Sequence, residues 1–96
     1  MNRQQTLEIL TKLKPELVER FGVTRLALFG STVRDEARAD SDIDIVVAFD
    51  GTATSKKYFG VQFMLEDHLG CSVDLVTEKA LRPELKSFVE QEAINV

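Results

Sequence analysis

The sequence predicts a small α/β domain, because short apolar segments alternate along it with longer segments of helical periodicity. Strands are expected at 24–29, 42–49 and 72–76. Helices are expected before, between and after these strands, which gives the order α-β-α-β-α-β-α. Because 96 residues suffice for one hydrophobic core but not for two, the whole chain (1–96) is expected to be a single domain.

The first helix is expected over residues 4–21. Its apolar residues recur at helical spacing: Leu7, Leu10, Leu17, Val18 and Phe21. Pro15 lies inside this segment, so the sequence predicts a kink there or a split into two helices. Gly22 is expected to end the segment as a C-terminal cap.

Three further helices are expected. A short one covers residues 31–37, and a longer one covers 55–69, with Ser55 as its N-cap and Gly70 at its end. The apolar stripe of the longer helix consists of Tyr58, Val61, Leu65 and Leu69. The last helix begins at Pro83, because proline is favoured in a first turn. The residues that it is expected to bury are Leu85, Phe88 and Val89.

The composition is typical of a globular protein with a net negative charge. The formal charge is −4 at pH 7, and no apolar run approaches the roughly 20 residues that span a bilayer. We therefore expect no membrane insertion, and the acidity argues against broad binding to nucleic acid. The single cysteine, Cys71, excludes an internal disulfide and favours a cytoplasmic location. A phosphate-bearing substrate would need a metal cation to offset the acidity.

The second expected strand carries two acidic residues on one face. Side chains alternate across a strand, so Asp42 and Asp44 project from the face opposite the isoleucines. Their Cα atoms are expected roughly 6.6 Å apart, so the carboxylates can converge on one cation or straddle two. Magnesium suits such a pair, because it prefers oxygen ligands and leaves positions for water and substrate phosphates.

The third expected strand repeats this arrangement with Asp74. If the strand lies beside the second in the same pleat phase, Asp74 joins Asp42 and Asp44 on one face. It would then be a third metal ligand or the base that takes a proton from an attacking hydroxyl. Acidic residues spaced in this way are also common on ordinary protein surfaces, so the carboxylates alone do not establish a site.

A glycine-serine turn precedes the acidic strand. Gly30 allows close approach of the backbone to a ligand, and Ser31 can donate from its N–H and its hydroxyl. The first turn of the following helix presents further N–H groups of the kind that hold phosphates, and Arg34 can reach the same anion. An ordinary capping turn contains the same residues, so this signal is also weak in isolation.

Together these features resemble a known family. Gly30-Ser31, ten intervening residues and Asp42-Ile43-Asp44 match the G-S-x(10)-D-x-D signature of the DNA polymerase β-type nucleotidyltransferase superfamily. The segment LFGSTVRDEARADSDIDIVV resembles the minimal nucleotidyltransferase (MNT) domain. The matching residues are Leu28, Phe29, Gly30, Ser31, Arg34, Ala37, Ser41, Asp42, Ile43, Asp44 and Val47. The stretch VDLVTEKALRPEL around Asp74 also resembles the family, whereas many members carry glycine in place of Asp35.

The resemblance implies a polymerase β-like nucleotidyltransferase domain, α+β-like in layout, with a mixed sheet of three or four strands. It implies that Gly30 and Ser31 hold the β- and γ-phosphates of a nucleoside triphosphate. Asp42 and Asp44 would bind two Mg²⁺ ions, and Asp74 would bind the metal near the acceptor or act as the base. Attack of an acceptor hydroxyl on the α-phosphorus would release pyrophosphate.

The resemblance also implies a partner, because the sequence shows no second domain that could bind an acceptor. Free-standing MNT proteins are often encoded beside a HEPN-domain protein, as antitoxin and toxin. The expected function is therefore Mg²⁺-dependent transfer of AMP from ATP, or of another nucleoside monophosphate, to a hydroxyl of a HEPN partner, in a homo- or hetero-oligomer. Two alternatives stay open: a non-catalytic antitoxin that masks its partner stoichiometrically, and a metal-binding protein without a nucleotide.

Overall fold

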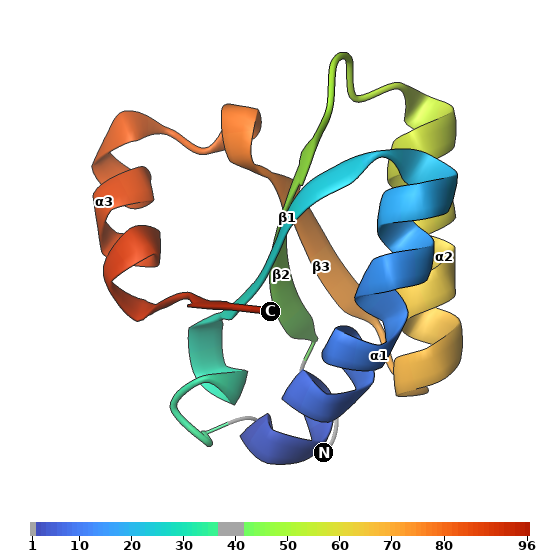
Figure 1. Cartoon of the computed structure of the whole chain (residues 1–96). Helices are drawn as coiled ribbons and strands as arrows, with labels where there is room; N and C mark the ends of the chain where they lie inside the picture. Colours follow the sequence, from blue (N-terminus) through green and yellow to red (C-terminus); the bar gives the residue numbers. More distant parts are fainter. Residues whose placement is uncertain (1, 37–41) are drawn as a thin grey trace.

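The strand with alternating acids and isoleucines lies inside a mixed β-sheet (Figure 1). The computed structural model describes residues 2–36 and 42–96, and within them the sheet has four strands in the order β3-β2-β1-β4. These are β1 (Val23–Phe29), β2 (Ile43–Phe49), β3 (Val73–Thr77) and β4 (Ile94–Asn95). β1 pairs antiparallel with β2 and with β4, whereas β2 and β3 are parallel. The predicted α+β domain with a mixed sheet is confirmed.

The two faces of the sheet contact different helices, because side chains alternate across each strand. Ile43, Ile45 and Val47 of β2 pack in the main core with helices α1 (Arg3–Phe21) and α2 (Ser55–Leu69). Val46 points to the opposite face, where it packs with Ala27 and with Val89 of helix α3 (Pro83–Glu92). Figure 1 shows α1 and α2 on one side of the sheet and α3 on the other. The alternation predicted for the second strand is therefore confirmed.

Helix α1 is capped at both ends and runs without a break. Asn2 forms a reciprocal capping box with Gln5, and Gly22 ends the helix with a left-handed φ of 70°. The predicted split at Pro15 does not occur. Leu10, Leu13 and Leu17 are buried on both sides of the proline, and this packing holds the helix together despite one missing backbone hydrogen bond.

Helix α2 has the predicted bounds and a different N-cap. The hydroxyl of Thr54, not of Ser55, accepts a hydrogen bond from the N–H of Lys57 at 3.3 Å. The N-cap therefore lies one residue earlier than the sequence suggested, because Thr54 supplies the same chemistry. Gly70 ends the helix as predicted, and the buried residues are Val61, Leu65 and Leu69.

Helix α3 begins at Pro83 as predicted, but fewer of its apolar side chains are buried than predicted. Val89 is 5% exposed, whereas Leu85 and Phe88 are 51% and 60% exposed. The prediction that all three are buried is wrong for Leu85 and Phe88. Of the three, only Val89 packs with Ala27 and Val46 of the sheet, whereas Leu85 and Phe88 line an open cavity beside it.

The strand after α3 has no counterpart in the sequence prediction. β4 has two residues, which is too short for a periodic pattern, and it pairs with Ala27 and Leu28 of β1. The Arg25 guanidinium of β1 also contacts α3, at 2.7 Å from Glu90. It lies 3.3 Å from Glu78, in the 3₁₀ turn Glu78–Ala80 that follows β3. Within residues 2–36 and 42–96, no helix is both long and apolar enough to cross a bilayer.

Candidate functional site

The Gly-Ser turn follows directly from β1. Gly30 to Thr32 form a single 3₁₀ turn, and Gly30 has a φ of +77°. A Cβ on Gly30 would lie 2.1 Å from Oδ2 of Asp44, which leaves no space for any side chain. The structure thus explains why glycine stands here, and it places the turn against the acidic strand. Ser31 is half-buried within the same turn.

The helix predicted over 31–37 is shorter in the structure. The 3₁₀ turn ends at Thr32, and the backbone reverses at Asp35, which has a left-handed φ of 55°. A residue in this conformation interrupts a right-handed helix, and glycine adopts it most readily. Here the residue is Asp35, and its side chain accepts a hydrogen bond at 3.0 Å from the N–H of Arg3, at the start of α1. Ala37 and Ser41 of the matched motif lie outside the described residues.

Two acidic residues meet across parallel strands. Asp44 of β2 is in register with Asp74 of β3 on one side and with Phe29 of β1 on the other. The pKa of Asp44 is raised to about 6, first by burial and then by the charge of Asp74 and a hydrogen bond with it. The charge of Asp42 adds to this, while Arg34 opposes it. The predicted approach of Asp74 to the acidic strand is therefore seen for Asp44.

Asp42 lies beside this pair but outside the strand. β2 begins at Ile43, one residue later than predicted, and the Asp42 side chain is exposed. Among residues 2–36 and 42–96, no three histidine, cysteine or acidic side chains are close enough together to form a metal site by themselves. The structure therefore presents a close Asp44–Asp74 pair with Asp42 near it, rather than a finished three-carboxylate cluster.

The chemistry of this pair fits a divalent cation. Magnesium is held in proteins by one or two carboxylates, and water and phosphate oxygens complete its octahedron. Asp44 and Asp74 supply two such carboxylates, and the raised pKa of Asp44 reflects a concentration of negative charge that a cation would neutralise. These two residues, with Asp42 beside them, are the ones in the described chain that would hold the metal.

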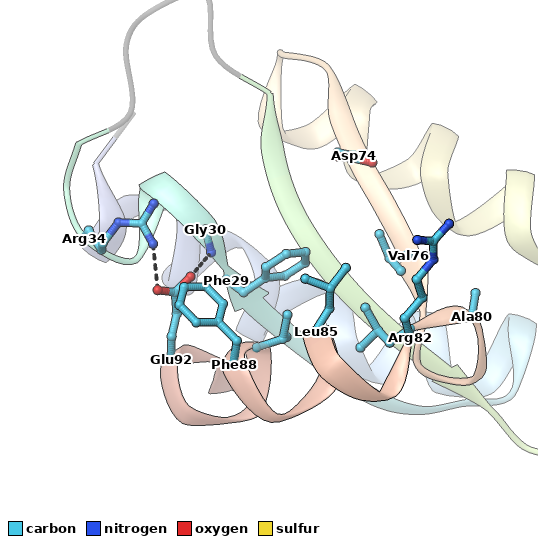
Figure 2. A pocket seen from close by; sticks show the side chains of 12 residues that line it. Phe29, Gly30, Arg34, Asp74, Val76, Ala80, Arg82, Leu85, Phe88 and Glu92 are labelled. Carbon is cyan, nitrogen blue, oxygen red and sulfur yellow. Dashed lines mark hydrogen bonds and ion pairs between the residues drawn. The ribbon is translucent and has the colours of Figure 1, made fainter.

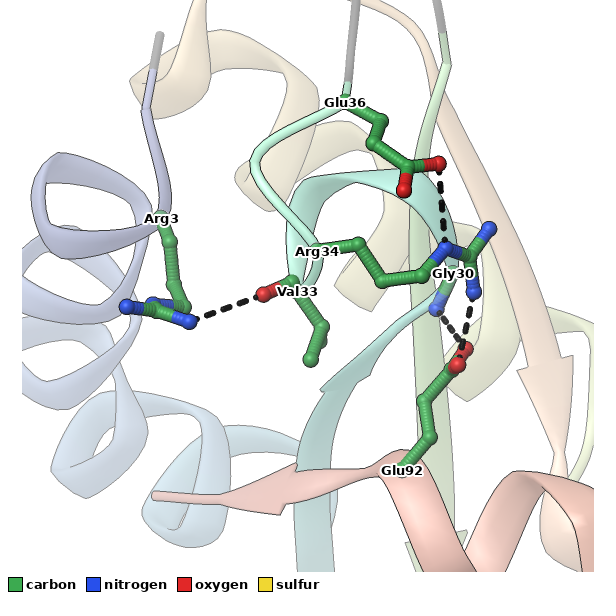
Figure 3. Close-up of polar contacts among 6 residues, drawn as sticks. All are labelled: Arg3, Gly30, Val33, Arg34, Glu36 and Glu92. Carbon is green, nitrogen blue, oxygen red and sulfur yellow. Dashed lines mark hydrogen bonds and ion pairs between the residues drawn. The ribbon is translucent and has the colours of Figure 1, made fainter.

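The anion donors of the turn converge on a residue from the other end of the chain (Figures 2 and 3). The N–H of Gly30 donates to Oε1 of Glu92 at 2.8 Å, and the Arg34 guanidinium donates to Oε2 at 2.6 Å. Arg34 also contacts Glu36 at 3.3 Å, and its pKa is raised by the hydrogen bonds to Glu92 and Glu36. Gly30 and Arg34 thus converge on one anion in the structure. The anion is the Glu92 carboxylate, which no sequence motif marks.

A cavity of about 510 Å³ lies beside these groups, between the sheet and α3 (Figure 2). Gly30, Arg34 and Glu92 line one end, and Asp74 and Val76 of β3 line another part. The exposed apolar side chains of α3 and the end of β1 complete the wall: Phe29, Leu85 and Phe88. Its volume is in the range of small-molecule sites, and its lining is largely apolar with a few charged groups.

The fold and this arrangement agree with comparisons to known proteins. The family of nucleotidyltransferase domains matches residues 10–96. The chain belongs to the nucleotidyltransferase family. It is similar to protein adenylyltransferase MntA of Thermococcus cleftensis, with 43% identity over 88 residues that cover 92% of this chain and 89% of the relative.

Solved structures place this nucleotidyltransferase among the minimal members of the family. One structure, provisionally named a minimal nucleotidyltransferase, is 38% identical with a TM-score of 0.85, over 100% of this chain and 97% of that one. A second is an MNT antitoxin complex with a tri-AMPylated HEPN toxin of Shewanella oneidensis. It is 22% identical with a TM-score of 0.69, over 97% of this chain and 70% of that one. At 22% identity this likeness shows the fold alone. The predicted MNT domain is confirmed.

Proposed function

We propose that this nucleotidyltransferase transfers AMP from ATP to a hydroxyl group of a HEPN-domain protein and thereby acts as its antitoxin. The observation that carries the proposal is the placement of an anion-binding turn directly against an acidic pair. Gly30 and Arg34 hold a carboxylate at 2.8 and 2.6 Å, and Asp44 lies against the same glycine. A triphosphate bound by the turn would thus lie beside the residues suited to Mg²⁺.

The similarity to a protein adenylyltransferase supports AMP as the transferred group. The complex of an MNT antitoxin with an AMPylated HEPN toxin supports the class of partner, because it shares this fold. The cavity offers space next to Asp74 for a nucleotide or for the acceptor side chain. Nothing in its lining marks one base, so ATP is proposed from the similarity.

Each residue has a defined task in the proposed reaction. Gly30, Ser31 and Arg34 would bind the β- and γ-phosphates. Asp42, Asp44 and Asp74 would hold two Mg²⁺ ions, which would supply positive charge to the attacking and leaving oxygens. The acceptor oxygen forms a bond to the α-phosphorus, and the bond from that phosphorus to the bridging oxygen breaks. Pyrophosphate leaves, and in this proposal Asp74 accepts the hydroxyl proton.

A mass-spectrometric assay tests this proposal. The protein is incubated with Mg²⁺ and each of the four ribonucleoside triphosphates, with and without the product of the neighbouring gene, which we expect to be the HEPN partner. We expect the partner to gain one or more AMP groups with ATP, and to gain none when Asp44→Asn replaces the wild type. Absence of any nucleotide addition would contradict the proposed transfer.

One observation favours a second candidate, an antitoxin that masks its partner without catalysis. The donors assigned to the triphosphate already bind Glu92. If Asp44→Asn protects cells from the HEPN protein as well as the wild type does, and no mass change accompanies protection, masking is the function.

A further inference from the structure

The contact between Glu92 and the phosphate donors has a consequence for nucleotide binding. The Glu92 carboxylate takes one hydrogen bond from the backbone N–H of Gly30 and one from the Arg34 guanidinium, so it uses both oxygens (Figure 3). Two charge-assisted bonds on a side chain that is 17% exposed form a stable contact. A carboxylate held in this way occupies the place that phosphate oxygens take at such a turn.

We infer that Glu92 is an internal competitor of the triphosphate, whose side chain must leave Gly30 and Arg34 before the nucleotide binds. The inference rests on the proposed function, since it assigns these two donors to the substrate. A phosphate oxygen cannot take the Gly30 N–H while Glu92 holds it, because that group has one hydrogen, and a phosphate beside the Glu92 carboxylate would be repelled by its like charge.

The backbone near Glu92 holds the competitor in place. Val89 is buried against the sheet, and Glu90 is ion-paired with Arg25 at 2.7 Å. Ile94 of β4 pairs with Leu28 of β1. These anchors keep the Glu92 backbone beside the turn, so its carboxylate is always available at a high effective concentration. Rotation of the side chain is enough to free the donors, and α3 does not have to unfold.

The fraction of molecules in which Glu92 has left Gly30 and Arg34 sets the apparent affinity for the nucleotide. If Glu92 occupies the donors in roughly nine molecules of ten, the apparent Kd for the triphosphate is about tenfold weaker than the intrinsic value. A partner that binds Glu92, or draws it away from Arg34, would remove this penalty. The contact is thus suited to keep the free nucleotidyltransferase poorly loaded and to favour loading in a complex.

Calorimetric titration with Mg²⁺ and the non-hydrolysable analogue AMP-PNP tests the inference on the full chain. Glu92→Gln keeps the size of the side chain and removes its charge, and Glu92→Asp keeps the charge but shortens the reach. Glu84→Gln is the matched control, because it removes the same charge from the exposed first turn of the same helix, away from Gly30 and Arg34. We expect about tenfold tighter binding for Glu92→Gln, a smaller gain for Glu92→Asp, and wild-type affinity for Glu84→Gln.

A thermal unfolding measurement without nucleotide separates competition from a structural role. Loss of the contact should lower the Tm of Glu92→Gln while its affinity for AMP-PNP rises, and a residue with only a structural role would lower both. Unchanged or weaker binding by both Glu92 variants, with the wild type binding normally, would overturn the inference alone. If neither the wild type nor any variant binds AMP-PNP, the proposed function is overturned together with it.

Discussion

Gly30 is the residue with the least freedom to change. Its φ of +77° disfavours any other residue, and a Cβ at this position would lie only 2.1 Å from Oδ2 of Asp44. We expect Gly30→Ala to lower the free energy of unfolding by about 2–4 kcal/mol, through backbone strain and displacement of Asp44. Urea unfolding followed by circular dichroism measures this.

Gly51 offers a matched control for that substitution. Its φ is +79°, yet a Cβ there would meet nothing within 4 Å. Gly51→Ala therefore carries the backbone strain without the clash, and we expect a loss of about 1–2 kcal/mol. Equal losses for the two variants would show that the contact between Gly30 and Asp44 is unimportant.

Asp44 couples the stability of the fold to pH. Its pKa is raised from 3.8 to about 6, so the native state binds more protons than the unfolded state between these values. The contribution of Asp44 to the free energy of unfolding is therefore largest below pH 4 and is lost as the pH rises through 6. At pH 7 in the absence of Mg²⁺, we expect Asp44→Asn to be about 1–2 kcal/mol more stable than the wild type, after allowance for solvent at the half-buried carboxylate.

The same substitution should abolish the transfer reaction. Under the proposed function Asp44 holds Mg²⁺, so its loss is expected to lower the rate at least roughly a hundredfold. Denaturation curves at pH 4 and pH 7 should show the stability difference only at pH 7, beside an activity assay on the same preparation. A variant that is inactive and also less stable at pH 7 would contradict the assignment of Asp44 as a strained, functional acid.

At the scale of the elements, Pro15 destabilises α1, and the packing of that helix in the core offsets this loss. It lies inside a 19-residue helix, where a proline removes one backbone hydrogen bond. We expect Pro15→Ala to raise the free energy of unfolding by about 1–2 kcal/mol. This is less than the difference of about 3 kcal/mol in helix propensity between alanine and proline, because alanine also increases the conformational entropy of the unfolded chain. Pro83→Ala is the control. Pro83 occupies the first turn of α3, where proline is favoured, and no gain is expected there. Similar gains at both positions would refute this explanation.

The elements that could be predicted are those with a long internal pattern. β2 places Ile43, Ile45 and Val47 on alternate positions, and α2 carries its stripe over 15 residues between Thr54 and Gly70, so the sequence predicts both with nearly correct bounds. The two-residue β4 and the 3₁₀ turn at Gly30 have no periodicity to detect. The exposure of Leu85 and Phe88 depends on how α3 lies on the sheet, which a helical stripe alone cannot specify.

The features of the candidate site that could be predicted are likewise those that are local in sequence. The fixed spacing of Gly30, Ser31, Asp42 and Asp44 is local in sequence, so the motif could be found there. The register of Asp74 with Asp44 required the parallel pairing of two strands, which the sequence allowed but did not determine. The role of Glu92 could not be predicted, because it depends on a contact across 62 residues and on a strand too short to detect.

At the scale of the whole molecule, the formal charge of −4 and the acidic pair at one end of the sheet lead us to expect that Mg²⁺ stabilises the native state. Mg²⁺ at ten times its Kd should stabilise the native state by about 1.4 kcal/mol, if it binds only that state. For a domain of this size the Tm should rise by roughly 6–11 °C. Differential scanning calorimetry with Mg²⁺, and again after chelation, measures the change.

The pH dependence identifies the site responsible for that shift. Mg²⁺ competes with the proton on Asp44, whose pKa is about 6, so the rise in Tm should be larger at pH 7 than at pH 5. Asp44→Asn should show little rise at either pH, whereas Asp67→Asn, on the exposed face of α2, should behave as the wild type does. Sodium chloride at equal ionic strength controls for screening. A Tm that responds equally to both salts would mean that the carboxylates do not bind the ion specifically and that a triphosphate must bring the metal to the turn.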